Sequence, residues 1–228
     1  MKNPGVRAHP MLAAFFFVAL GLCMAAPAKA QQEIPPPQGK GPVVVVVSGA
    51  MGAAAYLAPA RRIAALGYDV VLVDGNAVKG SQGAALKAVV QNAPNAPHGL
   101  PGKVGMVGFS LGGGMALFYA SRWPDLVSVI VAWYPATSMI GGIPVFVGKI
   151  KVPVLMFAGV EDSYHNCCLI TTARQLAEAA TVQNAPLQLI TYPNVGHDFV
   201  LAGAAYAPSA ASDSWRRATA ELAQYLRH

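Results

Sequence analysis

The chain has 228 residues, of which 54% are hydrophobic and 11% charged, and its formal net charge is +6. This length suits one domain with a sizeable core, and the composition excludes an intrinsically disordered or low-complexity protein. The few basic residues form no Lys/Arg cluster, so we expect no nucleic-acid partner.

Residues 1–30 are predicted to be a signal peptide. The start is positively charged, residues 11–24 form an apolar run of 14 residues, and Ala28-Lys29-Ala30 has the small-x-small pattern cleaved by signal peptidase. A spanning helix needs roughly 20 residues, so we expect no stable membrane anchor after cleavage. Cleavage before Gln31 removes three basic residues and no acid, leaving 13 Lys+Arg against 10 Asp+Glu and a charge of +3.

The expected periplasmic or secreted location is an oxidising compartment, but the cysteines cannot build a disulfide framework. Cleavage removes Cys23 and leaves the neighbours Cys167 and Cys168, which cannot join distant segments. A vicinal disulfide, pairing with another chain, and a reduced buried pair all remain open. A zinc site with His165 is disfavoured, because a fourth ligand and the usual spacing are missing.

The remaining chain is predicted to be a polar, proline-rich leader at residues 31–42 followed by one domain at 43–228. Strand and helix patterns alternate along this domain. Strands are predicted at 43–47, 68–73, 103–109, 126–133, 152–158 and 187–192, and helices at 53–66, 81–91, 111–121, 167–180 and 209–226. The alternation predicts an α/β fold with an open, doubly wound, mostly parallel sheet of about six strands and no cap domain.

Ligands of such sheets lie beyond the carboxyl ends of the strands, so the loops that follow strands are the candidates for chemistry. The loop after the third predicted strand reads Gly108-Phe109-Ser110-Leu111-Gly112, a G-x-S-x-G nucleophile elbow between a strand and a helix. In this turn the serine hydroxyl is raised above the sheet, and the glycines leave room for backbone that passes close by. The pattern predicts Ser110 as the nucleophile.

A serine hydroxyl needs a base, and the base needs an orienting acid. Asp162 follows the fifth predicted strand and His197 follows the sixth, in the chain order serine, acid, histidine. Glu161 is the rival acid, but the shorter Asp162 suits a fixed hydrogen bond to imidazole. Asp198, directly after the histidine, is expected to point away from its ring.

The oxyanion donors are predicted to be the backbone N–H of Leu111, at the start of a helix, and that of Ala50, with Gly49 as the alternative. A glycine turn at residues 48–52 without a catalytic part is the competing interpretation. Four aromatic residues near strand ends are candidates both for the substrate pocket and for plain core packing: Tyr56, Trp133, Tyr134 and Phe199.

The elbow, the turn from Gly159 to Asp162 and the segment Gly196-His197-Asp198-Phe199 together resemble the dienelactone hydrolase family of the α/β-hydrolase superfamily. The resemblance covers about residues 43–226 and implies a lidless, cofactor-free hydrolase of small esters or lactones. The acyl-transfer mechanism expected of the three residues requires no metal. The family's namesake enzymes carry a cysteine where this chain has Ser110. They also have an acidic residue in the loop that corresponds to Ser48-Gly49-Ala50-Met51-Gly52, so ordinary esterase chemistry is expected here.

The predicted function is therefore an exported serine hydrolase that acts on small-molecule esters or lactones through an acyl-enzyme. Two other interpretations remain open. An acyltransferase would use the same three residues with an acceptor other than water, and a catalytically silent binding protein would keep only the fold. The sequence indicates neither the acyl specificity nor the oligomeric state.

Overall fold

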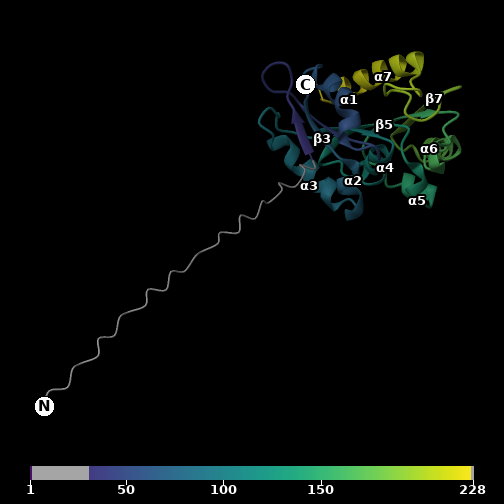
Figure 1. Ribbon diagram of the computed structural model, residues 1–228. Coiled ribbons are helices and arrows are strands. Elements are labelled where there is room, and N and C mark those ends of the chain that lie inside the picture. The colour runs from purple at the N-terminus through teal and green to yellow at the C-terminus, as the bar shows by residue number, and fades with distance from the viewer. Residues whose placement is uncertain (2–30, 227–228) are drawn as a thin grey trace.

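The computed structural model describes Met1 and residues 31–226, so the predicted signal peptide lies, apart from Met1, outside the described residues. Seven strands form one sheet in the order β1-β3-β2-β4-β5-β6-β7, and only β1 runs antiparallel to its neighbour (Figure 1). The strands are β1 (Gln31–Ile34), β2 (Val43–Val47), β3 (Asp69–Val73), β4 (Val104–Phe109), β5 (Val127–Trp133), β6 (Val154–Gly159) and β7 (Leu187–Tyr192). The predicted α/β class and doubly wound sheet are confirmed.

Helices cover both faces of the sheet. Two of them, α1 (Leu57–Ala64) and α7 (Pro208–Leu226), pack on one face. The opposite face is covered by α3 (Ala84–Asn92), α4 (Leu111–Phe118), α5 (Ile143–Val147) and α6 (Ile170–Gln183). The continuous valine run of β2 is buried at every position, as expected for a central strand with a helix layer on each side. No cap domain is present in the described part of the chain.

The predicted leader is partly wrong. Gln31–Ile34 pairs with β3 and forms the edge of the sheet, which therefore has seven strands. This strand was missed because its sequence, Gln-Gln-Glu-Ile, has no apolar strand pattern. An edge strand needs none, since backbone hydrogen bonds can hold it while its side chains stay largely exposed. The short helices α2 (Gly75–Val78) and α5 were also not predicted.

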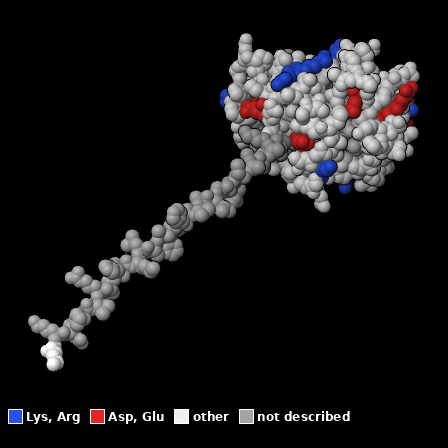
Figure 2. All heavy atoms as spheres, in the orientation of Figure 1, with Lys and Arg blue, Asp and Glu red and all other residues white. Residues whose placement is uncertain are grey.

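Charged side chains are sparse on the surface. On the face seen in Figure 2, the Lys and Arg atoms and the Asp and Glu atoms lie in small groups separated by uncharged surface. Within the described residues, no helix has the length and apolar character needed to cross a membrane.

Candidate active site

Ser110 lies in a strained turn between β4 and α4. Its backbone has φ 50° and ψ −115°, and its N–H donates to the Trp133 carbonyl at 3.0 Å. A Cβ on Gly108 would lie 2.6 Å from Gly112 O, and one on Gly112 would overlap the carbonyl of Val47. The two glycines therefore allow the close backbone approach that the elbow requires.

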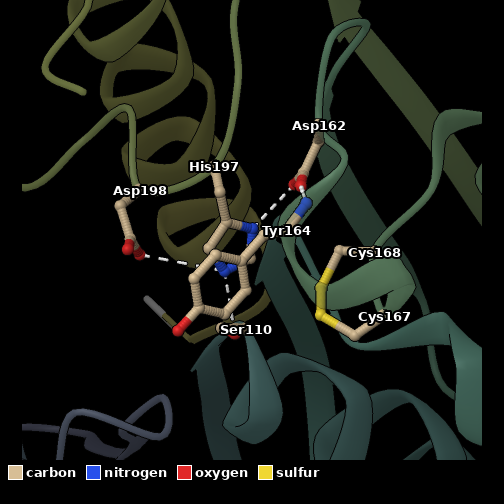
Figure 3. Close-up of a disulfide and its surroundings, with 7 residues drawn as sticks. All are labelled: Ser110, Asp162, Tyr164, Cys167, Cys168, His197 and Asp198. Carbon is tan, nitrogen blue, oxygen red and sulfur yellow. Dashed lines mark hydrogen bonds and ion pairs between the residues drawn. A yellow bond between two sulfur atoms is a disulfide. The ribbon is translucent and has the colours of Figure 1, made fainter.

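The structure brings the three predicted side chains together. His197 Nε2 lies 2.9 Å from Ser110 Oγ, and His197 Nδ1 lies 2.7 Å from Asp162 Oδ2 (Figure 3). The Asp162 side chain is completely buried and that of His197 is 8% exposed. The second Asp162 oxygen, Oδ1, accepts the N–H of Tyr164 at 3.1 Å. We call these three residues the Ser–His–Asp array.

Backbone contacts hold the acid loop against the histidine loop. The N–H of Val160 donates to Tyr192 O and that of Glu161 donates to Val195 O, each at 2.9 Å. A Cβ on Gly159 would overlap the Val195 carbonyl, so glycine is needed where the two loops meet. Glu161 is exposed, while Asp162 is buried and lies against the imidazole.

Two features of the acid loop were not predicted as parts of the site. The Tyr164 ring stacks on the His197 imidazole, with centroids 4.5 Å apart and planes 4° apart. Farther along the loop, Cys167 and Cys168 form a vicinal disulfide, which selects one of the three states left open by the sequence (Figure 3). Cys168 Sγ lies within 4.8 Å of ligand atoms of Asp162 and His197, but a half-cystine offers no thiolate to a metal ion.

The two predicted oxyanion donors come from different elements: Ala50 lies in the loop after β2, and Leu111 begins α4. Among the described residues, the backbone N–H of Ala50 has no acceptor, and that of Leu111 is at the first position of α4, where no intrahelical acceptor exists. The Ala50 carbonyl accepts Asn76 Nδ2 at 2.9 Å, and Gly75 N–H donates to Ser48 Oγ at 3.0 Å. These contacts fix the loop after β2 to the start of α2.

The four aromatic candidates separate into two pairs. All four are fully buried and belong to one core cluster. Trp133 contacts the rings of Phe109, Phe157 and Trp215, and Phe199 contacts those of Tyr134 and Tyr192, so neither of them has a ring contact with His197 among the described residues.

Tyr134 and Tyr56 lie beside the array. The Tyr134 ring centroid is 4.7 Å from that of His197. A Cβ on Gly49 would overlap the Tyr56 hydroxyl and lie 3.1 Å from Ser110 Cβ. Burial, and secondarily the charge of Asp198, raises the pKa of Tyr56, and burial raises the pKa of Tyr134 as well. Both hydroxyls therefore stay protonated at neutral pH.

The expectation that Asp198 points away from the histidine is wrong. Its Oδ1 lies 3.9 Å from His197 Nε2, on the opposite side of the imidazole from Asp162 (Figure 3). The backbone of Asp198 has φ 57°, a left-handed conformation, and this turns the side chain back toward the ring. Sequence periodicity carries no signal for such a turn.

Comparisons with known proteins show which family the chain resembles. The profile of the dienelactone hydrolase family matches residues 72–226. A Yersinia pestis protein named for carboxymethylenebutenolidase activity is 35% identical over 127 residues, which cover 50% of this chain and 44% of that protein. The protein usf of Aquifex pyrophilus is 26% identical over 149 residues, or 63% of this chain and 60% of that one. The matched segments span about half of these relatives' lengths.

Solved structures share the fold. A Klebsiella pneumoniae structure described as a dienelactone hydrolase has a TM-score of 0.73 at 23% identity, covering 86% of this chain and 92% of the other. A dienelactone hydrolase-like promiscuous phosphotriesterase, P91 from metagenomic libraries, has 0.68 at 19% identity, with 86% and 99% covered. Thermogutta terrifontis esterase 2 also has 0.68, at 16% identity, with 87% and 90% covered. With its family profile matched over most of the domain, this chain belongs to the dienelactone hydrolase family.

Proposed function

We propose that this protein is an exported serine hydrolase that cleaves small carboxylic esters or lactones. The observation that carries the proposal is the unbroken series of hydrogen bonds from Asp162 Oδ2 to His197 Nδ1, at 2.7 Å, and from His197 Nε2 to Ser110 Oγ, at 2.9 Å. Family membership and the esterase among the similar folds support the same reaction class.

The reaction proceeds in two acyl-transfer steps. Ser110 Oγ attacks the ester carbonyl while His197 Nε2 accepts its proton, and the carbonyl oxygen gains a negative charge. The N–H groups of Leu111 and Ala50 donate to this oxyanion, and the dipole of α4 adds to the stabilisation. His197 then protonates the departing alkoxide, and water repeats the sequence to release the acid. Asp162 stays ionised and holds the imidazole in the required tautomer.

Export to the periplasm or the medium is part of the proposal. Its support is the signal-peptide pattern of residues 1–30, together with a disulfide between Cys167 and Cys168, since disulfides persist mainly in oxidising compartments. Mass measurement of the protein recovered outside the cytoplasm tests it: cleavage after Ala30 is expected, whereas an intact N-terminus in the cytoplasm would contradict it.

The catalytic proposal is tested with a fluorophosphonate probe and p-nitrophenyl acetate on wild-type protein, Ser110→Ala and Ser209→Ala. Ser209 is an exposed serine in α7 that makes no hydrogen bond to the described residues of the array, and it serves as the matched control. Labelling and turnover are expected in wild type and Ser209→Ala and are expected to disappear in Ser110→Ala, with residual hydrolysis at least about 10³-fold lower. A folded wild-type protein that neither labels nor turns over ester would contradict the proposal.

A further inference from the structure

Three titratable side chains meet at the amino end of the parallel strands, away from the Ser–His–Asp array. Glu33 is in β1, Asp69 begins β3, and His98 lies in the segment before β4. One ligand atom of each residue lies within 4.8 Å of those of the other two. Ser110 follows the carboxyl end of β4, so this group lies at the other end of the sheet. We call Glu33, Asp69 and His98 the edge cluster.

Backbone contacts hold the three segments of the edge cluster in place. Gly41 donates its N–H to His98 O at 2.9 Å, and Asp69 donates its N–H to Pro42 O at 3.0 Å. The N–H of His98 donates to Glu33 Oε1 at 3.2 Å, and His98 Nδ1 lies 3.0 Å from the same oxygen. The short link before β2 therefore connects segments that are far apart in the sequence, and their side chains converge.

Asp69 is the residue of the cluster that points to a ligand. It is 0% exposed, and neither of its carboxylate oxygens has a hydrogen-bond partner among the described residues. Buried charges in proteins are normally paired or coordinate a metal ion. Among the ion pairs of the described residues, Glu33 pairs only with His98 and none includes Asp69, so no lysine or arginine neutralises the two acids.

The donor set indicates the kind of ion. Two carboxylates supply oxygens and negative charge, and an imidazole supplies a nitrogen, a combination that suits Zn²⁺, whereas Mg²⁺ and Ca²⁺ prefer oxygen ligands alone. Two donors of one tetrahedral Zn²⁺ lie about 3.3–3.5 Å apart. Only small side-chain movements are needed to reach this spacing, and His98 and Glu33 can make them because their side chains are 46% and 28% exposed. Water can take the fourth position from the exposed side.

We propose that Glu33, Asp69 and His98 form a Zn²⁺ site that fastens β1 to the rest of the sheet. Strand β1 has four residues, lies at the edge of the sheet and pairs only with β3. An ion held by Glu33 in β1 and by Asp69 in β3 adds a second link across this edge, and His98 ties the link to the segment before β4. The inference goes beyond the proposed function and does not depend on it, because no residue of the Ser–His–Asp array takes part.

Zinc titration of protein without a histidine tag tests the site. Each protein is first treated with EDTA and then studied by calorimetry and thermal unfolding at about pH 7.5, where an ordinary histidine is mostly neutral. Wild type is expected to bind one Zn²⁺ at the edge cluster. Free Zn²⁺ at about 100 times the dissociation constant should raise its melting temperature by about 5 °C or more.

Asp69→Asn and His98→Gln each remove one donor. Both are expected to weaken Zn²⁺ binding at least about 100-fold, so that the same Zn²⁺ concentration no longer raises the melting temperature. Asp69→Asn also removes a buried charge from the metal-free protein, so only the change caused by Zn²⁺ is compared. Asp125→Asn and His165→Gln, which alter exposed side chains outside the cluster, are the matched controls and should respond like wild type.

Hydrogen exchange shows where the ion acts. Zn²⁺ is expected to slow exchange of the β1 amides about tenfold or more in wild type and not in His98→Gln, because the edge strand opens locally. Mg²⁺ and Ca²⁺ at the same concentration should not stabilise wild type. The inference would be overturned by a wild-type protein that does not respond to Zn²⁺, or by an equal response to Mg²⁺. Stabilisation by Zn²⁺ that survives in either Asp69→Asn or His98→Gln would also overturn it.

Discussion

The aromatic ring of Tyr164 lies parallel to the His197 imidazole, with 4.5 Å between centroids and 4° between planes. Tyr164 also donates its backbone N–H to Asp162 Oδ1 at 3.1 Å. One residue of the acid loop thus contacts both partners of the Asp–His pair. A tyrosine face also attracts the imidazolium that forms when the histidine accepts the serine proton.

Two substitutions of Tyr164 distinguish the contribution of its aromatic ring from that of its hydroxyl group. An aromatic pair contributes about 0.5–1.5 kcal/mol beyond its buried area, so Tyr164→Ala is expected to lower kcat with p-nitrophenyl acetate by about two- to tenfold. Tyr164→Phe keeps the stacked ring and should remain close to wild type. If both variants behaved like wild type, the stacking would have no part in catalysis.

Asp162 and Glu161 form a matched pair of adjacent acids. Asp162→Asn keeps the shape but no longer fixes the imidazole tautomer, and its expected loss of kcat is on the order of 10³- to 10⁴-fold. Glu161→Gln should change kcat less than about twofold, because this side chain is exposed. Steady-state kinetics of the two proteins decides the assignment, and a reversed order would move the acid to Glu161.

The vicinal disulfide is expected to support the site more than the fold. The covalent loop it closes contains only neighbouring residues, so it restricts the unfolded chain very little. The preceding residues His165 and Asn166 have φ of 44° and 54°, so the loop carries unusual backbone that a cross-link helps to retain. Cys167→Ala/Cys168→Ala is expected to lower kcat/KM about tenfold, by displacing Tyr164, while the melting temperature changes little.

Reduction provides the control for that double variant. Treating wild type with a reductant should reproduce its kinetics, with the thiols counted by alkylation and mass, and should leave the variant unchanged. A large fall in melting temperature with kcat/KM intact would instead make the disulfide a stabiliser of the fold.

Asp69, at the start of β3, should make stability depend on pH. It is fully buried, and neither carboxylate oxygen has a hydrogen-bond partner among the described residues. Burial, with a further contribution from Glu33, raises its pKa from 3.8 to about 6 against the opposing effect of His98. Because the folded-state pKa exceeds the unfolded one, the stabilising contribution of the protonated form is complete below about pH 4 and is lost as pH rises through 6.

Asp69→Asn is therefore expected to raise the free energy of unfolding at pH 8 by about 1–2 kcal/mol and to lose this advantage near pH 4. Urea denaturation at the two pH values measures the effect, and Asp125→Asn, at an exposed position, is the control. A variant less stable than wild type at pH 8 would show that the ionised carboxylate is favourably held.

Local patterns in the sequence were enough to predict the α/β class, the central strands and the chain order of Ser110, Asp162 and His197. The reason is that these features rest on short-range constraints: a β-branched run buried on both faces, glycines where backbone passes close, and loops that directly follow strands. The distances between the three side chains, 2.9 Å and 2.7 Å, required the structure.

Only the tertiary structure decided which neighbouring residues belong to the site. Trp133 and Tyr134 are adjacent and both buried in the core, yet Tyr134 contacts His197 while Trp133 contacts Trp215, because the strand ends between them and Tyr134 has φ 36°. Asp198 likewise turns toward the imidazole through a left-handed backbone. Strand β1 depends on an open edge of β3 that no local pattern reveals. Long-range contacts and single backbone angles set these features, and neither leaves a periodic trace in the sequence.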